Sequence, residues 1–329
     1  MHATELWESK NPSSRFARIA LWPLSLLYAV GWQCYLSIYR LGFKKAKHPH
    51  SPILCVGNLV SGGSGKTPLV LHMVHVLREL GYEVVVSSSG YGSPAAEAAR
   101  VAPEGPLKAS DWGDEAAMFR WLIPDLPLIV GRRRVLAAKL AHQNFPNAVL
   151  LMDDGFQHLP LKKDLTIIVD PKAPTNPFCL PAGPYREPRF NRKRADLVIP
   201  GEFSIVEEPP EICNPRGEKR EVATCTVLCA LGQPQKVPTT LEEMGVKVKS
   251  KLFLPDHDPL TGGTLLDNLP IDLPVVVTAK DWVKLRERPD VEERDFLILK
   301  HAVRVEPKDT FYTWLKQRLN GIKTTSHPQ

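Results

Sequence analysis

The sequence predicts an α/β fold in which a parallel sheet is covered by helices on both faces. Short apolar runs alternate with helical segments between residues 52 and 169, which is typical of β-α-β units. A glycine-rich segment separates the first apolar run from the first helix, and a later run ends in two aspartates. Ligand sites of such sheets lie at the carboxyl ends of the strands, so both features are expected at one edge.

The composition is that of a globular protein with a mildly basic surface. Of 329 residues, 43% are hydrophobic and 24% are charged, and the net charge is +6. This charge suits anionic partners such as nucleotides or phospholipid headgroups, and it equally serves solubility. We see no basic patch interleaved with aromatic residues, so nucleic-acid binding is not expected. The six cysteines form no CxxC pair, so we expect no zinc site and a reduced compartment.

Residues 1–47 are predicted to associate with a membrane. No charged residue occurs at positions 19–39, a stretch about long enough to span a bilayer core. Arg15 and Arg18 precede it, and basic residues follow it, which argues against a cleaved signal peptide. Its Trp and Tyr residues favour the membrane interface. An amphipathic helix on an anionic leaflet is the favoured interpretation, while a spanning helix and a buried N-terminal helix remain open.

Residues 52–68 have the arrangement of a phosphate-binding P-loop. An apolar run at 52–56 precedes the glycine-rich segment, and apolar residues at helical spacing follow it up to Gly81. The usual pattern has glycine at position 60, where this chain has Val60. P-loop backbone N–H groups cradle phosphates, the lysine reaches the β- and γ-phosphates, and the threonine hydroxyl binds Mg²⁺. We therefore expect ATP and Mg²⁺ as cofactors, with these nucleotide-binding residues: Gly62, Gly63, Ser64, Gly65, Lys66, Thr67 and Pro68.

Two aspartates supply the second half of the predicted nucleotide site. Asp153 and Asp154 directly follow the apolar run at 148–152, and carboxylates in this place can hold Mg²⁺ directly or through water. A plain Asp-Gly turn after a strand is the alternative, and the sequence leaves open which of the two touches the metal. Further strands at 84–86 and 165–169 complete a P-loop NTPase-like core, for which we predict the range 48–200.

The C-terminal part, residues 201–329, is predicted to form a smaller α/β domain. Its first twenty residues are acidic and rich in proline, and they indicate a linker or an exposed hairpin. Buried strands are expected at 223–230, 273–278 and 296–299, and helices at 241–244 and 311–319.

Six motifs, met in order along the chain, resemble those of the tetraacyldisaccharide 4'-kinase family, the lipid A 4'-kinases of Gram-negative bacteria. The phosphate loop of that family also lacks glycine at position 60, so Val60 supports the resemblance. The other motifs are Gly113-Asp114-Glu115, Asp153-Asp154-Gly155-Phe156-Gln157-His158, Leu180-Pro181-Ala182-Gly183-Pro184-Tyr185-Arg186-Glu187, Asp256-His257 and Thr278-Ala279-Lys280-Asp281.

The resemblance implies transfer of the ATP γ-phosphoryl group to the 4'-hydroxyl of a tetraacyl glucosamine disaccharide 1-phosphate. This lipid-linked acceptor implies work at the cytoplasmic face of the bacterial inner membrane. The resemblance assigns Asp114 and His257 to an acid–histidine pair, and Lys66 and Arg186 to the transferring phosphoryl group. Because His257 comes from the C-terminal part, an active-site cleft between two lobes is expected. The Mg²⁺ ligands it implies are Thr67, Asp153, Asp154 and Glu115.

Three positions depart from the family pattern. Ser89 stands where arginine is common, Ala279 where glutamate is common, and Ala116 where proline is common. The arginines at 132–134 are a hypothetical source of compensating charge. Two other functions remain open, a P-loop switch ATPase or GTPase without a lipid substrate and an inactive membrane-bound scaffold. The sequence indicates no particular protein partner.

Overall fold

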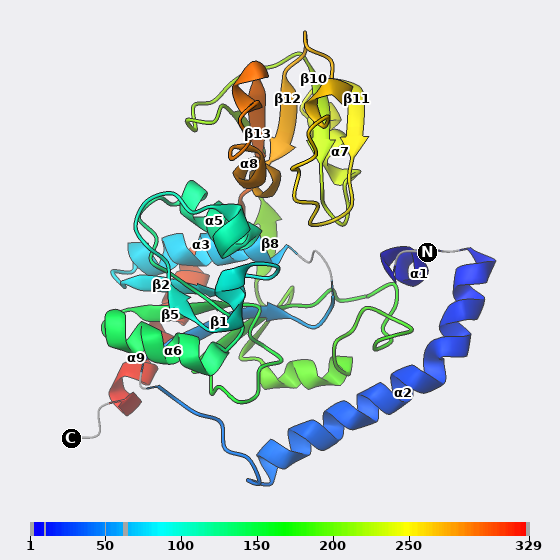
Figure 1. The fold of residues 1–329 in the computed structure, drawn as a ribbon. Helices are drawn as coiled ribbons and strands as arrows, with labels where there is room; N and C mark the ends of the chain where they lie inside the picture. The colour runs from blue at the N-terminus through cyan, green and yellow to red at the C-terminus, as the bar shows by residue number, and fades with distance from the viewer. Residues whose placement is uncertain (1–2, 10, 50, 62–64, 327–329) are drawn as a thin grey trace. The chain divides into compact units, whose positions relative to one another are not determined.

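The chain forms two units, and each unit is built from more than one segment of the sequence. The computed structural model describes residues 3–9, 11–49, 51–61 and 65–326 (Figure 1). Unit 1 comprises Met1–Ser87, Arg133–Val206 and Arg304–Gln329, and unit 2 comprises Ser88–Arg132 and Glu207–Val303. The three predicted ranges, 1–47, 48–200 and 201–329, stay a prediction about domains. The two units are a division by contacts, and their boundaries fall at other positions.

Unit 1 contains a parallel sheet whose strands lie in the order β2-β5-β1-β6-β7. Every residue of β1, β2 and β5 is buried, as expected for strands covered on both faces. The register places Val56 of β1 beside Asp153 of β5, so the two strands end at the same edge. The strands of unit 1 are β1 (Ile53–Asn58), β2 (Val84–Ser88), β5 (Val149–Asp153), β6 (Leu165–Val169), β7 (Leu197–Ile199), β8 (Ser204–Glu207) and β14 (Val303–Glu306).

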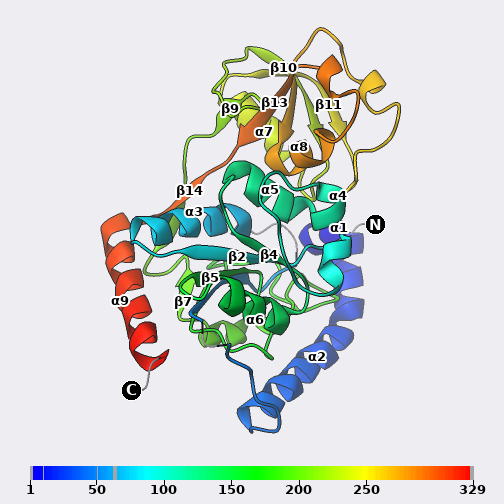
Figure 2. The ribbon, with the colours of Figure 1, turned by 60° about the vertical axis from the view of Figure 1, so that its left-hand side comes forward.

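Helices cover both faces of this sheet. Figures 1 and 2 show α3 and α6 on opposite sides of the strands. Leu69, Met73 and Leu77 of α3 recur at helical spacing and are fully buried, so one apolar stripe fixes this helix on the sheet. The helices of unit 1 are α1 (Ala3–Glu8), α2 (Pro12–Arg40), α3 (Lys66–Glu79), α6 (Arg134–Asn144), the 3-10 helix η2 (Arg189–Arg194) and α9 (Lys308–Ser326).

The N-terminal helix α2 leaves most of its apolar side chains exposed. Within the described residues it is the one helix long and apolar enough to cross a membrane, and only 11% of its apolar stretch is buried. A soluble core helix of this composition would instead be mostly buried. Its large exposed side chains are Phe16, Ile19, Trp22, Leu24, Leu26, Leu27 and Val30.

Unit 2 is built on a second, smaller sheet with strand order β11-β10-β12-β13-β9. The segment predicted as a linker or exposed hairpin contributes β9, which pairs antiparallel with β13 at the edge of this sheet. The strands of unit 2 are β3 (Arg100–Val101), β4 (Leu128–Val130), β9 (Glu211–Cys213), β10 (Thr224–Cys229), β11 (Lys247–Phe253), β12 (Val275–Thr278) and β13 (Phe296–Lys300). Its helices are η1 (Pro94–Glu97), α4 (Ala109–Trp112), α5 (Asp114–Leu122), α7 (Lys236–Glu243), η3 (Leu266–Asn268), α8 (Ala279–Leu285) and η4 (Val291–Glu293).

A half-buried histidine makes the stability of unit 1 depend on pH. The backbone N–H of Val305 donates to Nε2 of His72 at 3.2 Å, which requires that nitrogen to be unprotonated. Burial, reinforced by the charge of His75, lowers the pKa of His72 to about 4. The folded pKa lies below the unfolded value, so the stability that this contact provides is full above about pH 6.5. It is lost as the pH falls toward 4.

We expect the free energy of unfolding to fall more steeply with acidification in the parent than in a His72→Gln variant. The difference in slope should reach at most about 1.4 kcal/mol per pH unit, the value for one proton. Urea unfolding at several pH values between 7 and 4 measures it. Lys139→Gln, at an exposed position of α6 in the same unit, is the control. Parallel pH dependences in the parent and the His72 variant would contradict this assignment.

Candidate functional site

The start of α3 brings the P-loop lysine to the carboxyl ends of the strands. Gly65 has a φ of 71°, a left-handed conformation that glycine adopts readily, and Lys66 begins the helix. The ammonium group of Lys66 donates to Oδ1 of Asn58, the last residue of β1, at 3.0 Å. Three predicted nucleotide-binding residues, Gly62, Gly63 and Ser64, lie outside the described residues. Thr67 and Pro68 lie in the first turn of α3, as expected for a phosphate-binding helix.

Asp154 joins the P-loop to the Leu180–Glu187 motif. One of its carboxylate oxygens lies 2.8 Å from Nζ of Lys66, and the other accepts from the guanidinium of Arg186 at 2.8 Å. Burial opposes ionisation of this carboxyl group, but the two cations outweigh burial, and the pKa of Asp154 therefore lies below its ordinary value. The structure thus brings Lys66, Asp154 and Arg186 together, although they are far apart in sequence.

A close backbone approach explains one glycine of this region. A Cβ atom on Gly57 of β1 would lie 2.9 Å from Cβ of Phe156, closer than such atoms approach in proteins. Phe156 is buried and follows the two aspartates, so Gly57 lets their loop pack directly on the strand that leads into the P-loop.

The oxygen donors near the P-loop fit a magnesium ion. Asp153 ends β5 and is 3% exposed, and its backbone carbonyl accepts from Arg134 at 2.6 Å. Mg²⁺ in kinases usually takes one or two carboxylates and completes its shell with water and phosphate oxygens. A hydroxyl from Thr67 and a carboxylate from Asp153 or Asp154 match this chemistry. No group of three or more His, Cys, Asp or Glu residues suited to a metal occurs in the described parts of the chain.

Unit 2 contains the predicted acid–histidine pair. Nδ1 of His257 lies 3.3 Å from Oδ2 of Asp114, and the other ring nitrogen lies 3.3 Å from Nζ of Lys280. Lys284 lies 4.0 Å from the same oxygen of Asp114. The ring of Tyr91 packs 5.4 Å from the imidazole, measured between centroids. A carboxylate, an imidazole and two ammonium groups therefore surround one point of unit 2.

The backbone around Asp114 is held by two glycines. Gly113 has a φ of 86°, and a Cβ there would lie 3.2 Å from the backbone of Gly90. Only glycine accepts both the left-handed φ and this contact without strain. Asp114 is the first residue of α5, a place where an aspartate can simply begin a helix. Its side chain nevertheless faces His257. Glu115, the predicted metal ligand from this motif, accepts from the hydroxyl of Ser88 at 3.4 Å within unit 2.

The loop that carries Arg186 is anchored by a buried carboxylate at the end of β6. Asp170 accepts from the hydroxyl of Tyr185 at 2.9 Å and from the guanidinium groups of Arg189 and Arg192 at 2.9 and 3.1 Å. Its side chain is fully buried. In the sequence, the only signal of this anchor is an acidic residue at the end of a strand.

Replacing Asp170 with asparagine should destabilise unit 1. The neutral amide removes the counter-charge of two partly exposed guanidinium groups, and losing a hydrogen bond to a charged group costs about 1.5–3 kcal/mol. Denaturant unfolding measures the loss, and Asp309→Asn on the exposed surface of α9 is the matched control. An unchanged unfolding midpoint in Asp170→Asn would show that the anchor is not needed.

Other contacts lie beyond what sequence reasoning identified. Gln157 donates to the carbonyl of Asn58 at 2.9 Å and to Glu187 at 3.0 Å, and Arg194 pairs with the same buried glutamate. The arginines at 132–134 are the hypothetical source of charge in place of the arginine that Ser89 replaces. Among them, Arg134 is buried and donates to Ser87 and to the backbone carbonyl at the end of β5. Its charge therefore supports the strand ends, and whether it compensates for Ser89 stays a hypothesis.

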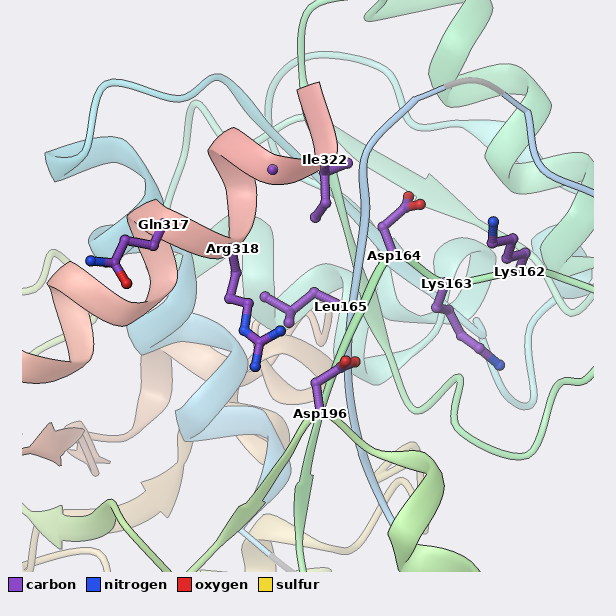
Figure 3. Close-up of a pocket in the computed structure, with 9 residues that line it drawn as sticks. Lys162, Lys163, Asp164, Leu165, Asp196, Gln317, Arg318 and Ile322 are labelled. Atoms are coloured by element: carbon purple, nitrogen blue, oxygen red, sulfur yellow. The ribbon is translucent and has the colours of Figure 1, made fainter. Parts of the chain in front are cut away.

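A pocket of about 440 Å³ lies at the amino ends of β6 and β7, whereas the P-loop follows the carboxyl end of β1 (Figure 3). It is lined by the residues before β6 and by α9, including Lys163, Asp164 and Arg318. Two of its polar side chains are engaged within the protein, because Lys163 donates to the carbonyls of Gly155 and His158 and Asp164 pairs with His48. This pocket is not the nucleotide site.

Comparisons with known proteins agree with the geometry. A sequence profile of the family described as Tetraacyldisaccharide-1-P 4'-kinase matches residues 17–320. A tetraacyldisaccharide 4'-kinase of Shewanella pealeana is 34% identical over 299 residues, covering 86% of this chain and 88% of the relative. One from Aromatoleum aromaticum is 31% identical, covering 91% and 93%.

A solved structure shares the fold. The crystal structure of LpxK from Aquifex aeolicus in complex with ATP superposes with a TM-score of 0.79 at 26% identity, covering 92% of this chain and 99% of that one. The predicted fold class and the resemblance read from the motifs are both confirmed. The chain belongs to the tetraacyldisaccharide-1-P 4'-kinase family.

Proposed function

We propose that this chain transfers the γ-phosphoryl group of ATP to the 4'-hydroxyl of a tetraacyl glucosamine disaccharide 1-phosphate, a late step of lipid A synthesis. The observation that carries the proposal is the contact of Lys66 and Arg186 with Asp154 at the P-loop of a chain that belongs to this kinase family. Phosphoryl transfer requires positioning and charge neutralisation more than covalent help, and two cations beside one carboxylate provide both.

Lys66 and Arg186 neutralise the phosphate oxygens in this proposal. The compact ammonium of Lys66 suits the β- and γ-phosphates, and the planar guanidinium of Arg186 suits two oxygens of the transferring group. Asp154 contacts both cations at 2.8 Å and so fixes where each one points. Thr67, Asp153, Asp154 and Glu115 are the residues proposed to hold Mg²⁺, which would supply further neutralisation of the phosphate charge.

Asp114 and His257 serve the acceptor hydroxyl. As the 4'-oxygen bonds to the γ-phosphorus, the bond to the ADP oxygen breaks, and the hydroxyl proton passes to the carboxylate of Asp114. The imidazole of His257, 3.3 Å from that carboxylate, orients it and shares the proton. Lys280 and Lys284 add positive charge beside the pair.

We further propose that α2 lies on the cytoplasmic leaflet of the inner membrane. Phe16 and Ile19 are 73% and 71% exposed, and Leu41 and Phe43 after the helix are also exposed. Basic residues flank the helix at both ends, and anionic headgroups attract such residues. An acylated acceptor held in that leaflet would reach the enzyme without leaving the bilayer.

The test is transfer of label from γ-labelled ATP to a tetraacyl disaccharide 1-phosphate in detergent micelles. We expect label in the lipid fraction. ATP hydrolysis that does not rise with added acceptor would instead favour a switch ATPase, an alternative to which family membership lends no support. Failure to bind Mg-ATP would indicate an inactive scaffold, and Ser89→Arg would then be the first reversion to try.

A further inference from the structure

Two hydroxyl groups of α2 face the loop that carries Arg186. The hydroxyl of Ser25 donates to the carbonyl of Cys179 at 2.8 Å and accepts from the backbone N–H of Ala182 at 2.9 Å. Ser25 is 3% exposed on a helix whose neighbouring side chains are mostly exposed. The hydroxyl of Tyr28, one turn later, donates to the carbonyl of Arg186 itself at 2.7 Å.

Arg186 is held at both of its backbone polar groups. Its N–H donates to the carbonyl of Leu59, which follows β1, at 2.7 Å, and its carbonyl accepts from Tyr28. Trp32 donates from Nε1 to the Tyr28 hydroxyl at 3.1 Å, which fixes the orientation of the phenol. Between these two attachments the guanidinium group reaches Asp154.

The direction of a guanidinium group depends on the backbone that carries it. A bidentate contact with a phosphoryl group needs the planar fork in one orientation, and a displacement of about 1 Å can cost 100-fold in rate. Tyr28 and Ser25 are polar side chains on the inward side of an otherwise apolar segment. Together they hydrogen-bond three backbone groups of the loop, which are the carbonyls of Cys179 and Arg186 and the N–H of Ala182.

We infer that Tyr28 and Ser25 are positioning residues for phosphoryl transfer, acting through the backbone of Arg186. The inference rests on the proposed function. It gives α2 a role in the chemistry that is separate from binding a membrane, because the helix that bears the apolar outer surface also sets the position of an active-site cation.

Kinetics of three variants test the inference. Tyr28→Phe removes one hydroxyl and keeps the ring, and we expect kcat to fall about tenfold with the KM for ATP changed less than twofold. Ser25→Ala should act in the same direction. Tyr39→Phe, which removes a hydroxyl from the same helix where the ring packs on Tyr35, should leave both constants unchanged. Equal kcat values for the parent and both test variants would overturn the inference.

A double-variant cycle separates positioning from a general loss of folded enzyme. If Tyr28 acts through Arg186, adding Tyr28→Phe to Arg186→Lys should cost little further activity. A full additional tenfold loss in that background would show that Tyr28 acts elsewhere, and it would overturn the inference.

Amide hydrogen exchange gives a readout that needs no activity. Tyr28→Phe should speed exchange at the amide of Arg186, and Ser25→Ala should speed it at Ala182, while Tyr39→Phe should do neither. Unchanged exchange in both test variants would overturn the inference. An inactive parent would overturn the proposed function itself, whereas an active parent matched by an equally active Tyr28→Phe variant would overturn only this inference.

Discussion

Lys66→Ala should lower kcat for phosphoryl transfer by about 1,000-fold. Removing one preorganised group that stabilises transition-state charge costs about 10²–10³ in rate, and Lys66 carries a full charge next to the phosphate loop. Its Nζ is positioned from two sides, by Asn58 at 3.0 Å and by Asp154 at 2.8 Å. Transfer of γ-label to the lipid acceptor measures the effect, with nucleotide binding followed separately.

The control for this variant is Lys139→Ala on the exposed surface of α6, which removes the same charge from the same unit. It should retain parent activity. The unfolding midpoint of Lys66→Ala must also be compared with that of the parent, since Asp154 loses one of its two cations. A folded Lys66→Ala protein that transfers phosphoryl groups at more than a tenth of the parent rate would contradict the role given to this lysine.

Asp114→Asn should lower kcat by about 10³-fold while leaving Mg-ATP binding intact. Asparagine keeps the shape of the side chain and its contact with His257, but it cannot accept the proton of the acceptor hydroxyl, a contribution worth about 10²–10⁴ in rate. Isothermal titration of nucleotide beside the lipid transfer assay separates the two effects. Asp111→Asn, an exposed carboxylate of the same unit, is the matched control and should be fully active.

The pairing of Asp114 with His257 predicts strong non-additivity. Residues that act as one unit lose most of their joint effect when either is removed. The double variant Asp114→Asn with His257→Ala should therefore be about as slow as the slower single variant. Losses that multiply would mean that the two residues assist the reaction independently, despite the 3.3 Å between them.

The sequence predicted the elements whose signal is local. The buried runs at β1, β5 and β6 are short and apolar, and the helix after Lys66 repeats its apolar residues at helical spacing, so each could be recognised from a few neighbouring residues. The motifs around Asp114, Asp154 and Arg186 identified the candidate site for the same reason, and the roles given to those residues stay predictions.

Contacts between distant segments could not be predicted in this way. Asp170 looked like the acid after a strand, and nothing near it in sequence shows that it holds Tyr185, Arg189 and Arg192. The small strand β9 lies in a segment rich in proline and acids, and it becomes a strand because β13 offers an open edge. Pairing of this kind depends on tertiary context rather than on local propensity.

The return of the chain to unit 1 has a consequence for its synthesis on the ribosome. Phe311 and Leu315 of α9 are fully buried, and Phe311 packs 5.2 Å from Phe203 of the same unit. The part of the unit 1 core that α9 covers therefore stays open until residues 308–326 have been translated. Nascent chains would expose this apolar surface throughout the synthesis of unit 2, which makes unit 1 a natural client for chaperones. A premature stop before α9 would leave Phe203 of unit 1 without the aromatic side chains of α9 that pack on it.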